Sequence, residues 1–314
     1  MPMGRKQKET VELRFYEIPQ GEPVLALLGE EWNRVYGHDN FYLHFHNLME
    51  IGICRKGEGE LIINEYTYTY RTNSVTLIPP NIPHTTISNG MTRNSWEFLY
   101  VDVNHVIEEL YGDRIAQKNE AIELVRRSAH LLHGSEYPEI AEIVNAIIRE
   151  EKKQSPYYRQ VITSYLHVLV YEMFRLNEVQ TQTRLEAAGS GTMRQIADAL
   201  TFVNDHYQEE VKVCTLAQVC GMSETSFRKV FEEYVHMLPM DYVNLVRVQY
   251  ACEQMKHGND SMDEVARKAG FSTTSTFNRN FKKFFNTSPY QWKINPQRYE
   301  RKLQNFHINA LKGW

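Results

Sequence analysis

The sequence predicts an α+β protein in which an antiparallel β-barrel or sandwich, followed by long helices, precedes an all-α C-terminal region. Three observations support this prediction. Short runs of β-favouring residues fill positions 40–103, helical spacing of apolar residues begins near position 119, and the last third repeats one helical layout at an offset of about 50 residues.

The β region shows the alternation of half-buried strands. Tyr66, Tyr68 and Tyr70 alternate with threonines, and a period of two places the tyrosines on one face of a strand. Further short apolar runs, separated by glycine, asparagine and proline, are Met49–Ile53, Leu61–Ile63, Val75–Ile78 and Trp96–Val103. We therefore expect several short strands joined by tight turns.

Helices are expected from Asn119 onward. Apolar residues recur at helical spacing from Ile122 through Leu131 to Ile148. Ser155 as the N-cap and Pro156 as the first helical residue predict the start of a long helix. That helix is apolar over a wide face, so it needs a partner helix or a partner subunit.

The polar stretch 178–192, which ends in Gly-Ser-Gly-Thr, has the composition of a linker. We expect residues 1–180 to form one domain, residues 181–192 the linker and residues 193–314 the second domain. Residues 192–314 hold 16 lysines and arginines against 13 acidic residues, whereas the rest of the chain holds 19 against 26. The more basic C-terminal part favours a polyanionic partner.

Several classes of protein are not expected. No run of 18 apolar residues and no secretory signal are found, and the four cysteines form no CxxC pair. These features predict no membrane partner and a reduced, cytoplasmic setting. No nucleophile–base pair, phosphate-binding glycine loop or spaced carboxylate pair suggests an enzyme.

The repeat in the last third has the layout of two helix-turn-helix units, at 216–234 and 263–285. In the first unit, Gly221 ends a short helix and Ser223 caps the next. In the second, Asp263 is expected to cap the short helix, Gly270 to end it and Ser272 to cap the next helix. Between the units, a helix is expected from Asp241 to Gly258.

The second helix of each unit divides into a phenylalanine face and a polar face. The aromatic face holds Phe227 and Phe231 in the first unit and Phe277 and Phe281 in the second. The polar face of the second unit suits base edges and phosphates in a major groove. The residues expected to contact DNA are Thr225, Arg228, Lys229, Thr274, Ser275, Asn278, Arg279, Lys282 and Lys283.

Residues 194–294 resemble the DNA-binding domain of the AraC/XylS family of bacterial transcription regulators. The resemblance rests on TLAQVCGMSETSFRKVFEEYVHMLPMDYV and SMDEVARKAGFSTTSTFNRNFKKFFNTSPYQW. It implies that the polar positions named above, from Thr225 to Lys229 and from Thr274 to Arg279, face bases. Two positions depart from the family pattern, since His236 and Asn286 stand where glycine is usual after each second helix.

The N-terminal histidines form a second candidate site. His44, His46 and Glu50 have even numbers and are expected to share one face of one strand, with His84 on another strand. The pattern from Gly37 through these residues to Gly57 resembles the first motif of the cupin superfamily. The sequence matches the second cupin motif less well, because Asn81 and Ser88 replace the glycine and asparagine that are usual in that motif. The resemblance implies a cupin-like barrel with a ligand pocket, followed by a dimerisation helix.

Two interpretations of His44, His46, Glu50 and His84 remain open. The four side chains could bind a divalent metal such as Zn²⁺, Mn²⁺, Ni²⁺ or Fe²⁺. Alternatively, they line a metal-free pocket and contact a polar effector, with Trp96 suited to stacking on a sugar. The departures at Asn81 and Ser88 favour the metal-free pocket, and no cofactor is expected.

Together these observations predict a sequence-specific DNA-binding transcription regulator that is not an enzyme. The family resemblance implies an activator that responds to a small-molecule effector, typically a sugar, with repression left open. Double-stranded promoter or operator DNA and a second copy of the chain are the expected partners, and RNA polymerase is a further one for an activator. The alternative is a metal-dependent cupin enzyme with an appended helical domain.

Overall fold

The computed structural model describes residues 11–14, 16, 18–19, 21–37, 43–63, 66–126, 128–181, 192–235, 237–257 and 260–294. The chain forms two compact units. One contains residues 16–41 and 46–190, and the other contains residues 191–314 together with residues 1–15 and 42–45.

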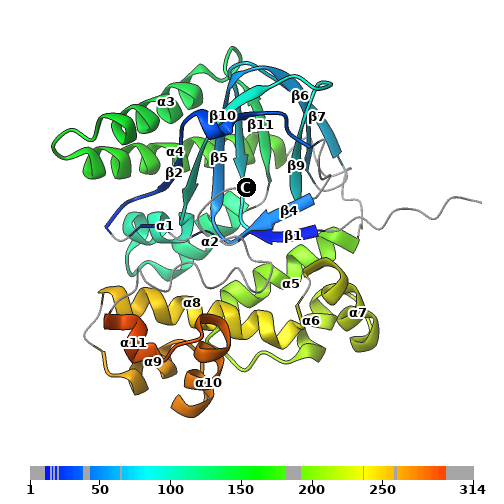
Figure 1. Ribbon diagram of the computed structural model, residues 1–314, viewed down its shortest axis with the longest axis vertical. Helices are drawn as coiled ribbons and strands as arrows, with labels where there is room; N and C mark the ends of the chain where they lie inside the picture. The colour runs from blue at the N-terminus through cyan, green and yellow to red at the C-terminus, as the bar shows by residue number, and fades with distance from the viewer. Residues whose placement is uncertain are drawn as a thin grey trace, which may run out of the picture. The chain divides into compact units, whose positions relative to one another are not determined.

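The N-terminal part consists of two antiparallel sheets, as the sequence predicts (Figure 1). One sheet has the strand order β1-β4-β9-β6-β7, and the other has the order β11-β8-β5-β10-β2, with β3 paired to β10. The strands are β1 Val11–Arg14, β2 Leu25–Leu27, β3 Asn33–Arg34, β4 Leu43–His46, β5 Met49–Lys56, β6 Glu58–Ile63, β7 Tyr66–Arg71, β8 Ser74–Ile78, β9 His84–Ser88, β10 Asn94–Val101 and β11 His130–His133.

Four helices cover the outer face of the six-stranded sheet. They are α1 Val103–Tyr111, α2 Ile115–Arg126, α3 Pro138–Lys153 and α4 Tyr158–Thr181. The odd-numbered residues of β5, such as Ile51 and Ile53, pack with Leu99 of β10 and with Val144 and Leu166 of the helices in the main core. The even-numbered residues of β5 therefore face the opposite way, into the barrel.

Three sequence expectations for this part are wrong in detail. Helix α1 was not expected, and Leu131 lies in strand β11 rather than in a helix. Helix α4 begins at Tyr158 and not at Pro156, because Tyr157 has a left-handed φ of 68° that no helix accommodates. The partner of α4's wide apolar face is the chain itself, since Ile162, Leu166 and the following buried residues join the main core.

The C-terminal unit is helical, as predicted. Its helices are α5 Thr192–His206, α6 Val213–Val219, α7 Glu224–Val235, α8 Pro239–His257, α9 Met262–Lys268, α10 Thr274–Phe285 and α11 Pro289–Ile294. Phe277, Phe281, Phe285 and Trp292 are all fully buried, and each ring contacts at least one of the others. Among the helices that the structure describes, none is long and apolar enough to cross a membrane.

Helix starts in this unit differ from the expected caps by one or two residues. Ser261, and not Asp263, caps α9 through a capping box with Glu264. Thr273, and not Ser272, caps α10 by accepting a hydrogen bond from the backbone N–H of Thr276 at 3.1 Å. Each expected residue lies within two positions of a second residue that can also cap, and the path of the backbone selects between them.

One carboxyl of this fold links stability to pH. Glu151 on α3 is half-buried, and its Oε1 has no hydrogen-bond partner among the described residues. Burial, and then the nearby charge of Glu22, raise the pKa of Glu151 from 4.5 to about 7. The folded protein therefore binds this proton more tightly than the unfolded chain does. The stabilisation is complete below a pH of about 4.5 and is lost as the pH rises through about 7.

We expect Glu151→Gln to remove this pH dependence. The glutamine stays neutral, so the variant should be more stable than the parent by about 1 kcal/mol near pH 8, and the two should converge below a pH of about 4.5. Urea unfolding at several pH values measures the difference. Parallel stability curves for parent and variant across this range would show that Glu151 titrates normally.

Candidate functional site

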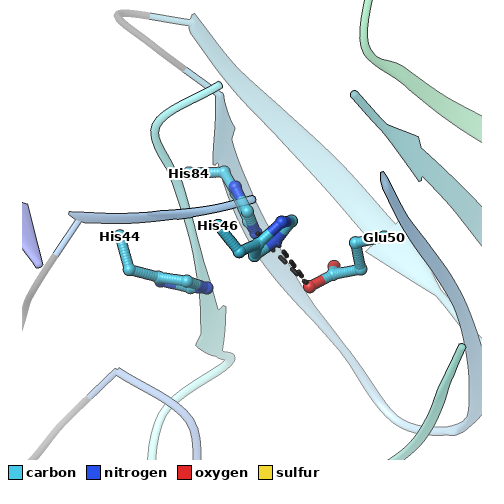
Figure 2. A group of neighbouring side chains, drawn as sticks. All are labelled: His44, His46, Glu50 and His84. Atoms are coloured by element: carbon cyan, nitrogen blue, oxygen red, sulfur yellow. Dashed lines mark hydrogen bonds and ion pairs between the residues drawn. The ribbon is translucent and has the colours of Figure 1, made fainter. Parts of the chain in front are cut away.

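Four polar side chains meet in the interior of the barrel (Figure 2). They are the four residues that the sequence predicts as a cluster: His44, His46, Glu50 and His84. One nitrogen or oxygen atom from each lies within 4.8 Å of the others, and all four side chains are buried. The structure therefore brings together every member of the predicted cluster.

The expected reason for their closeness is wrong. His44 and His46 lie on β4, whereas Glu50 lies on β5, with the turn at residues 47–48 between the two strands. Glu50 therefore reaches the histidines across a turn and not along one strand face. His84, the first residue of β9, comes from a further strand, as expected.

The two positions that depart from the cupin pattern have structural roles here. Asn81 adopts a left-handed φ of 64°, which glycine adopts most readily and asparagine tolerates. Its backbone N–H donates to the carbonyl oxygen of His46 at 2.9 Å. The hydroxyl of Ser88 accepts a hydrogen bond from the backbone N–H of Tyr36 at 2.9 Å. Both replacements thus keep the loops around the cluster in place.

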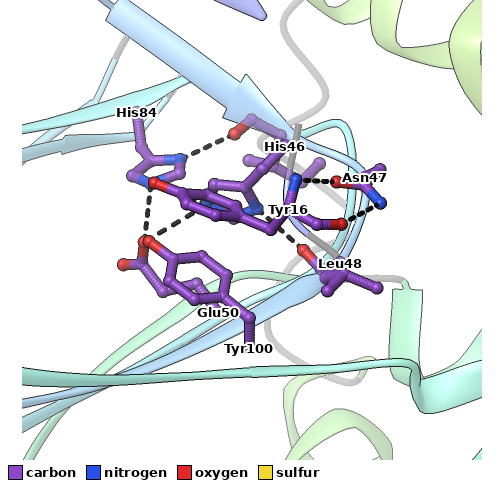
Figure 3. A network of polar contacts seen from close by, with 8 residues as sticks. Tyr16, His46, Asn47, Leu48, Glu50, His84 and Tyr100 are labelled. Atoms are coloured by element: carbon purple, nitrogen blue, oxygen red, sulfur yellow. Dashed lines mark hydrogen bonds and ion pairs between the residues drawn. The ribbon is translucent and has the colours of Figure 1, made fainter. Parts of the chain in front are cut away.

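Backbone carbonyls fix the orientation of two imidazole rings. Nδ1 of His46 lies 2.7 Å from the carbonyl oxygen of Leu48, and Nδ1 of His84 lies 2.8 Å from that of Ile82. A carbonyl oxygen only accepts, so each Nδ1 must carry the hydrogen. The Nε2 atoms of both rings consequently point into the cluster, towards Glu50 (Figure 3).

The Glu50 carboxylate lies between the two Nε2 atoms. Its Oε2 is 3.2 Å from Nε2 of His46 and 3.5 Å from Nε2 of His84, and the two nitrogens are 3.3 Å apart. Burial acts to raise the pKa of Glu50, but the charge of His84 and hydrogen bonds from both histidines outweigh it and lower the pKa. Burial lowers the pKa of His46.

Three further residues surround the cluster, and the sequence analysis missed them (Figure 3). The hydroxyl of Tyr100 donates to Oε2 of Glu50 at 2.9 Å, and burial followed by the charge of Glu50 raises the pKa of that phenol. The ring of Tyr16 stacks on Tyr100 with centroids 3.9 Å apart. Asn47 holds residue 16 with two hydrogen bonds to its backbone, of 2.8 and 3.0 Å. Of these three residues, Tyr100 could have been identified only from the β5–β10 register, which pairs it with Glu50.

Trp96 lies apart from the cluster. It pairs with Cys54 on β5, four residues along the strand from Glu50, which corresponds to roughly 13 Å. Its ring is fully buried and stacks on Phe98 with centroids 5.7 Å apart, while Tyr70 meets it edge-on. The structure thus places Trp96 in an aromatic layer of the barrel and not beside the histidines.

The second helix-turn-helix unit presents a basic face on α10. Ser275, Asn278, Arg279 and Lys282 are exposed, while the phenylalanines on the opposite side of α10 are buried. Among the described residues, neither Arg279 nor Lys282 has an ion pair or hydrogen bond in the structure. Two of the other residues predicted to contact DNA already have partners in the C-terminal part of the chain. The Thr274 hydroxyl donates to Asp263 at 2.5 Å, and Lys283 pairs with Asp241 of α8 at 2.6 Å.

The turn before α10 requires glycine. Gly270 has a φ of 83°, and a Cβ atom there would lie 2.3 Å from the carbonyl oxygen of Tyr207. The helix also ends in a left-handed residue, because Asn286 is its C-cap at a φ of 51°. Asparagine therefore takes the conformation that the usual family glycine would take. The other departure, His236, lies outside the described residues.

The first unit is built in the same way but presents a neutralised face. Ser223 caps α7 by accepting from the N–H of Ser226 at 3.2 Å, as expected. Thr225, Arg228 and Lys229 are exposed. Arg228, however, donates two hydrogen bonds to the carboxylate of Glu224, at 2.7 and 3.1 Å. Its charge is thus compensated before any partner binds.

Comparisons with known proteins match both parts of the chain. A family model described as an AraC-like ligand binding domain matches residues 33–169, and one described as a helix-turn-helix domain matches residues 216–294. The chain is 23% identical to the transcriptional activator RhaS of Pectobacterium carotovorum subsp. carotovorum, over 78% of this chain and 85% of RhaS. It is 21% identical to the lactose operon transcription activator of Staphylococcus xylosus, over 64% of this chain and 68% of that protein. Wild-type ToxT of Vibrio cholerae, solved with an unsaturated fatty acid, is 17% identical over 87% of this chain and 94% of that chain, with a TM-score of 0.36.

The clamp between Asn47 and Tyr16 yields a prediction about stability. Asn47→Ala removes both hydrogen bonds to the backbone of residue 16, so we expect the free energy of unfolding to fall by about 1–3 kcal/mol. Amide exchange at Tyr16 should accelerate at the same time. Asn47→Asp keeps the acceptor for the Tyr16 N–H and serves as the control, with a smaller expected loss. An unchanged exchange rate in Asn47→Ala would contradict the clamp.

Proposed function

Because this chain belongs to the AraC/XylS family of transcription regulators, we propose that it binds specific promoter or operator DNA in response to a small molecule held in its N-terminal barrel. The ligand shifts a population between arrangements of the chain that differ in DNA affinity. It must bind the DNA-competent arrangement more tightly than the other, because equal affinity for both shifts nothing. We propose that the protein acts in the cytoplasm, where promoter DNA is found.

The exposed face of α10 is the observation that carries the proposal. Ser275 and Asn278 present hydroxyl and amide groups for base edges, and Arg279 follows them on the same helix. Lys282 extends this face with a charge suited to phosphate. Helix α8 joins the two units over 19 residues, or about 28 Å, which is close to the roughly 34 Å between successive major-groove openings. This spacing supports contact by both units on one side of a duplex.

The polar cluster in the barrel supports a polar effector. The imidazoles and carboxylate of His44, His46, Glu50 and His84 are suited to hydroxyl or carboxylate groups of a ligand. We propose a sugar, in keeping with a relative whose name refers to the lactose operon. Trp96 lies too far along β10 to share a small ligand with Glu50, so we do not assign it to this contact.

We propose that the protein acts as a homodimer and activator. Most of the apolar surface of α4 is buried in its own core, but Val168 and Tyr171, on one stripe of the helix, are 47% and 46% exposed. This stripe is the surface we assign to the dimer contact. Activation implies RNA polymerase as a further partner. The division into residues 1–180, 181–192 and 193–314 belongs to the same proposal.

A metal-dependent enzyme is the second candidate, and the composition of the histidine cluster is the observation that favours it. Three imidazoles and a carboxylate are ligands that a catalytic metal uses. Such an enzyme would convert a small substrate whether or not DNA were present. We expect no turnover and instead expect specific DNA binding.

The sharpest test of DNA recognition compares two arginines. We select a duplex from a randomised pool with the full-length chain and measure affinity by fluorescence anisotropy. Arg279→Ala should weaken binding by about 1–3 kcal/mol and relax preference at one base position, because this guanidinium is available to a base edge. Arg228→Ala should cost less, because Glu224 already compensates its charge. Glu224→Gln should strengthen binding by releasing Arg228.

Lysine variants provide the controls for this comparison. Lys282→Ala should weaken binding to all sequences alike and flatten its salt dependence, as expected for a phosphate contact. Lys283→Ala should have a smaller effect, because Lys283 is paired with Asp241. A larger loss for Arg228→Ala than for Arg279→Ala would overturn the assigned roles of the two units.

The dimer contact predicts a change of oligomeric state. Tyr171→Glu and Val168→Glu place a charge on the exposed stripe of α4, and sedimentation should show the full-length chain shifting from dimer to monomer. Met91→Glu, which alters another exposed apolar side chain in the turn before β10, is the matched control and should leave the dimer intact. A parent protein that is monomeric at every concentration would refute the dimer proposal.

A further inference from the structure

We propose that Asp263 makes Thr274 selective for cytosine or adenine, the bases that carry an amino group in the major groove. Asp263 acts as a positioning residue, because it fixes the hydrogen of the Thr274 hydroxyl and leaves the base contact to Thr274. The inference deepens the proposed function and rests on it, since it assigns a base preference to one position of the DNA site.

The direction of one hydrogen bond is the first support. The hydroxyl of Thr274, the first residue of α10, donates to Oδ1 of Asp263 at 2.5 Å. A carboxylate only accepts hydrogen bonds, so the hydroxyl hydrogen must point at Asp263. The length is that of a charge-assisted O–H···O⁻ bond, about 2.5–2.7 Å, which is roughly twice as strong as a neutral one. Because a hydroxyl has one hydrogen and two lone pairs, Thr274 is left with lone pairs alone for a base.

The chemistry of the major groove turns this restriction into a preference. Cytosine presents its N4 amino group there and adenine its N6 amino group, whereas guanine and thymine present only acceptors. A threonine hydroxyl that is able to rotate contacts either kind of group. While it is bound to Asp263, however, the Thr274 hydroxyl can only accept, and its lone pairs would face those of a guanine or thymine. We therefore expect cytosine or adenine on the strand that Thr274 contacts.

Local structure at both helix starts holds the two side chains in place. A capping box between Ser261 and Glu264 fixes the start of α9, on which Asp263 is the second residue. Thr273 caps α10 and so fixes the backbone of Thr274. The hydrogen bond thus joins two helix starts that are each fixed by contacts of their own. The N-terminal residues of the second helix are also those that contact base edges in a helix-turn-helix.

Neighbouring positions show that the restriction applies to Thr274 alone on this face. Ser275, the next residue of α10, is exposed, and in the described part of the chain its hydroxyl has no hydrogen bond. Its hydroxyl can therefore rotate and contact either kind of base group. The first unit lacks the arrangement, since Cys214 and Glu224 stand at the second position of α6 and the first position of α7. The preference is thus expected at one position, contacted by the second unit.

The test measures base preference along the DNA site. In the duplex selected with the full-length chain, each base pair is replaced in turn by every other, and affinities are measured by fluorescence anisotropy. Thr274→Val nearly keeps the shape but removes the hydroxyl, so it identifies the base that Thr274 contacts. There the parent should bind cytosine or adenine about tenfold more tightly than guanine or thymine. Asp263→Asn should reduce this preference to about twofold or less, because an amide both donates and accepts.

Controls separate the hydrogen bond from charge and folding. Thr274→Ser keeps a hydroxyl and should keep the preference. Asp260→Asn removes a nearby acidic charge, which pairs with Lys268 at 2.6 Å, and should change affinity for all sequences alike without altering base preference. Thermal unfolding identifies folded variants. A folded Asp263→Asn with the parent's preference, a parent that prefers guanine or thymine at this position, or a Thr274→Val that changes no position would overturn the proposal.

The same measurements separate this inference from the proposed function. A selection that enriches no duplex would refute specific DNA binding and this inference with it. An enriched duplex whose base preference is the same for the parent and for Asp263→Asn would refute the inference alone and leave the proposed function standing.

Discussion

The alternation of side chains along β5 is the constraint on which the N-terminal part of the structure depends. Its odd-numbered residues, Ile51 and Ile53 among them, join the core beneath helices α1 to α4. The same pleat must then send Glu50 into the barrel, where Tyr100 of β10 stands opposite it. A shift of one residue in this pairing would bury Glu50 among aliphatic side chains, so the apolar core also determines where the polar cluster lies.

Burying a carboxylate among histidines is costly unless its charge is compensated. The fold supplies part of the compensation through the Tyr100 hydroxyl and through the two imidazoles. It also keeps the rings from rotating away, because backbone carbonyls hold their outer nitrogens. A cluster that is held in this orientation is suited to a polar ligand.

In the C-terminal unit, apolar packing determines which polar groups are available to DNA. The phenylalanines of α10 and Trp292 of α11 occupy the buried side, so Arg279 and Lys282 are left on the surface. Intramolecular pairs then make the two units unequal. Glu224 holds Arg228 on α7, whereas Arg279 on α10 has no such partner among the described residues. The polar face of the second unit therefore carries more uncompensated positive charge than that of the first.

The sequence by itself determined the order of the two parts, the tandem helix-turn-helix units and the four members of the histidine cluster. These features follow from local periodicity, from turn residues and from motif spacing, all of which act over a few residues. Only the tertiary structure decided which strands carry the cluster, that Tyr16, Asn47 and Tyr100 surround it, and that Trp96 does not. It also placed Thr273 and Ser261 at the helix starts and paired Arg228 with Glu224. The physical reason is that strand register and the path of the backbone at each turn depend on contacts between distant segments. The pairing of surface charges depends on a choice among equally suitable neighbours. Local sequence patterns specify neither.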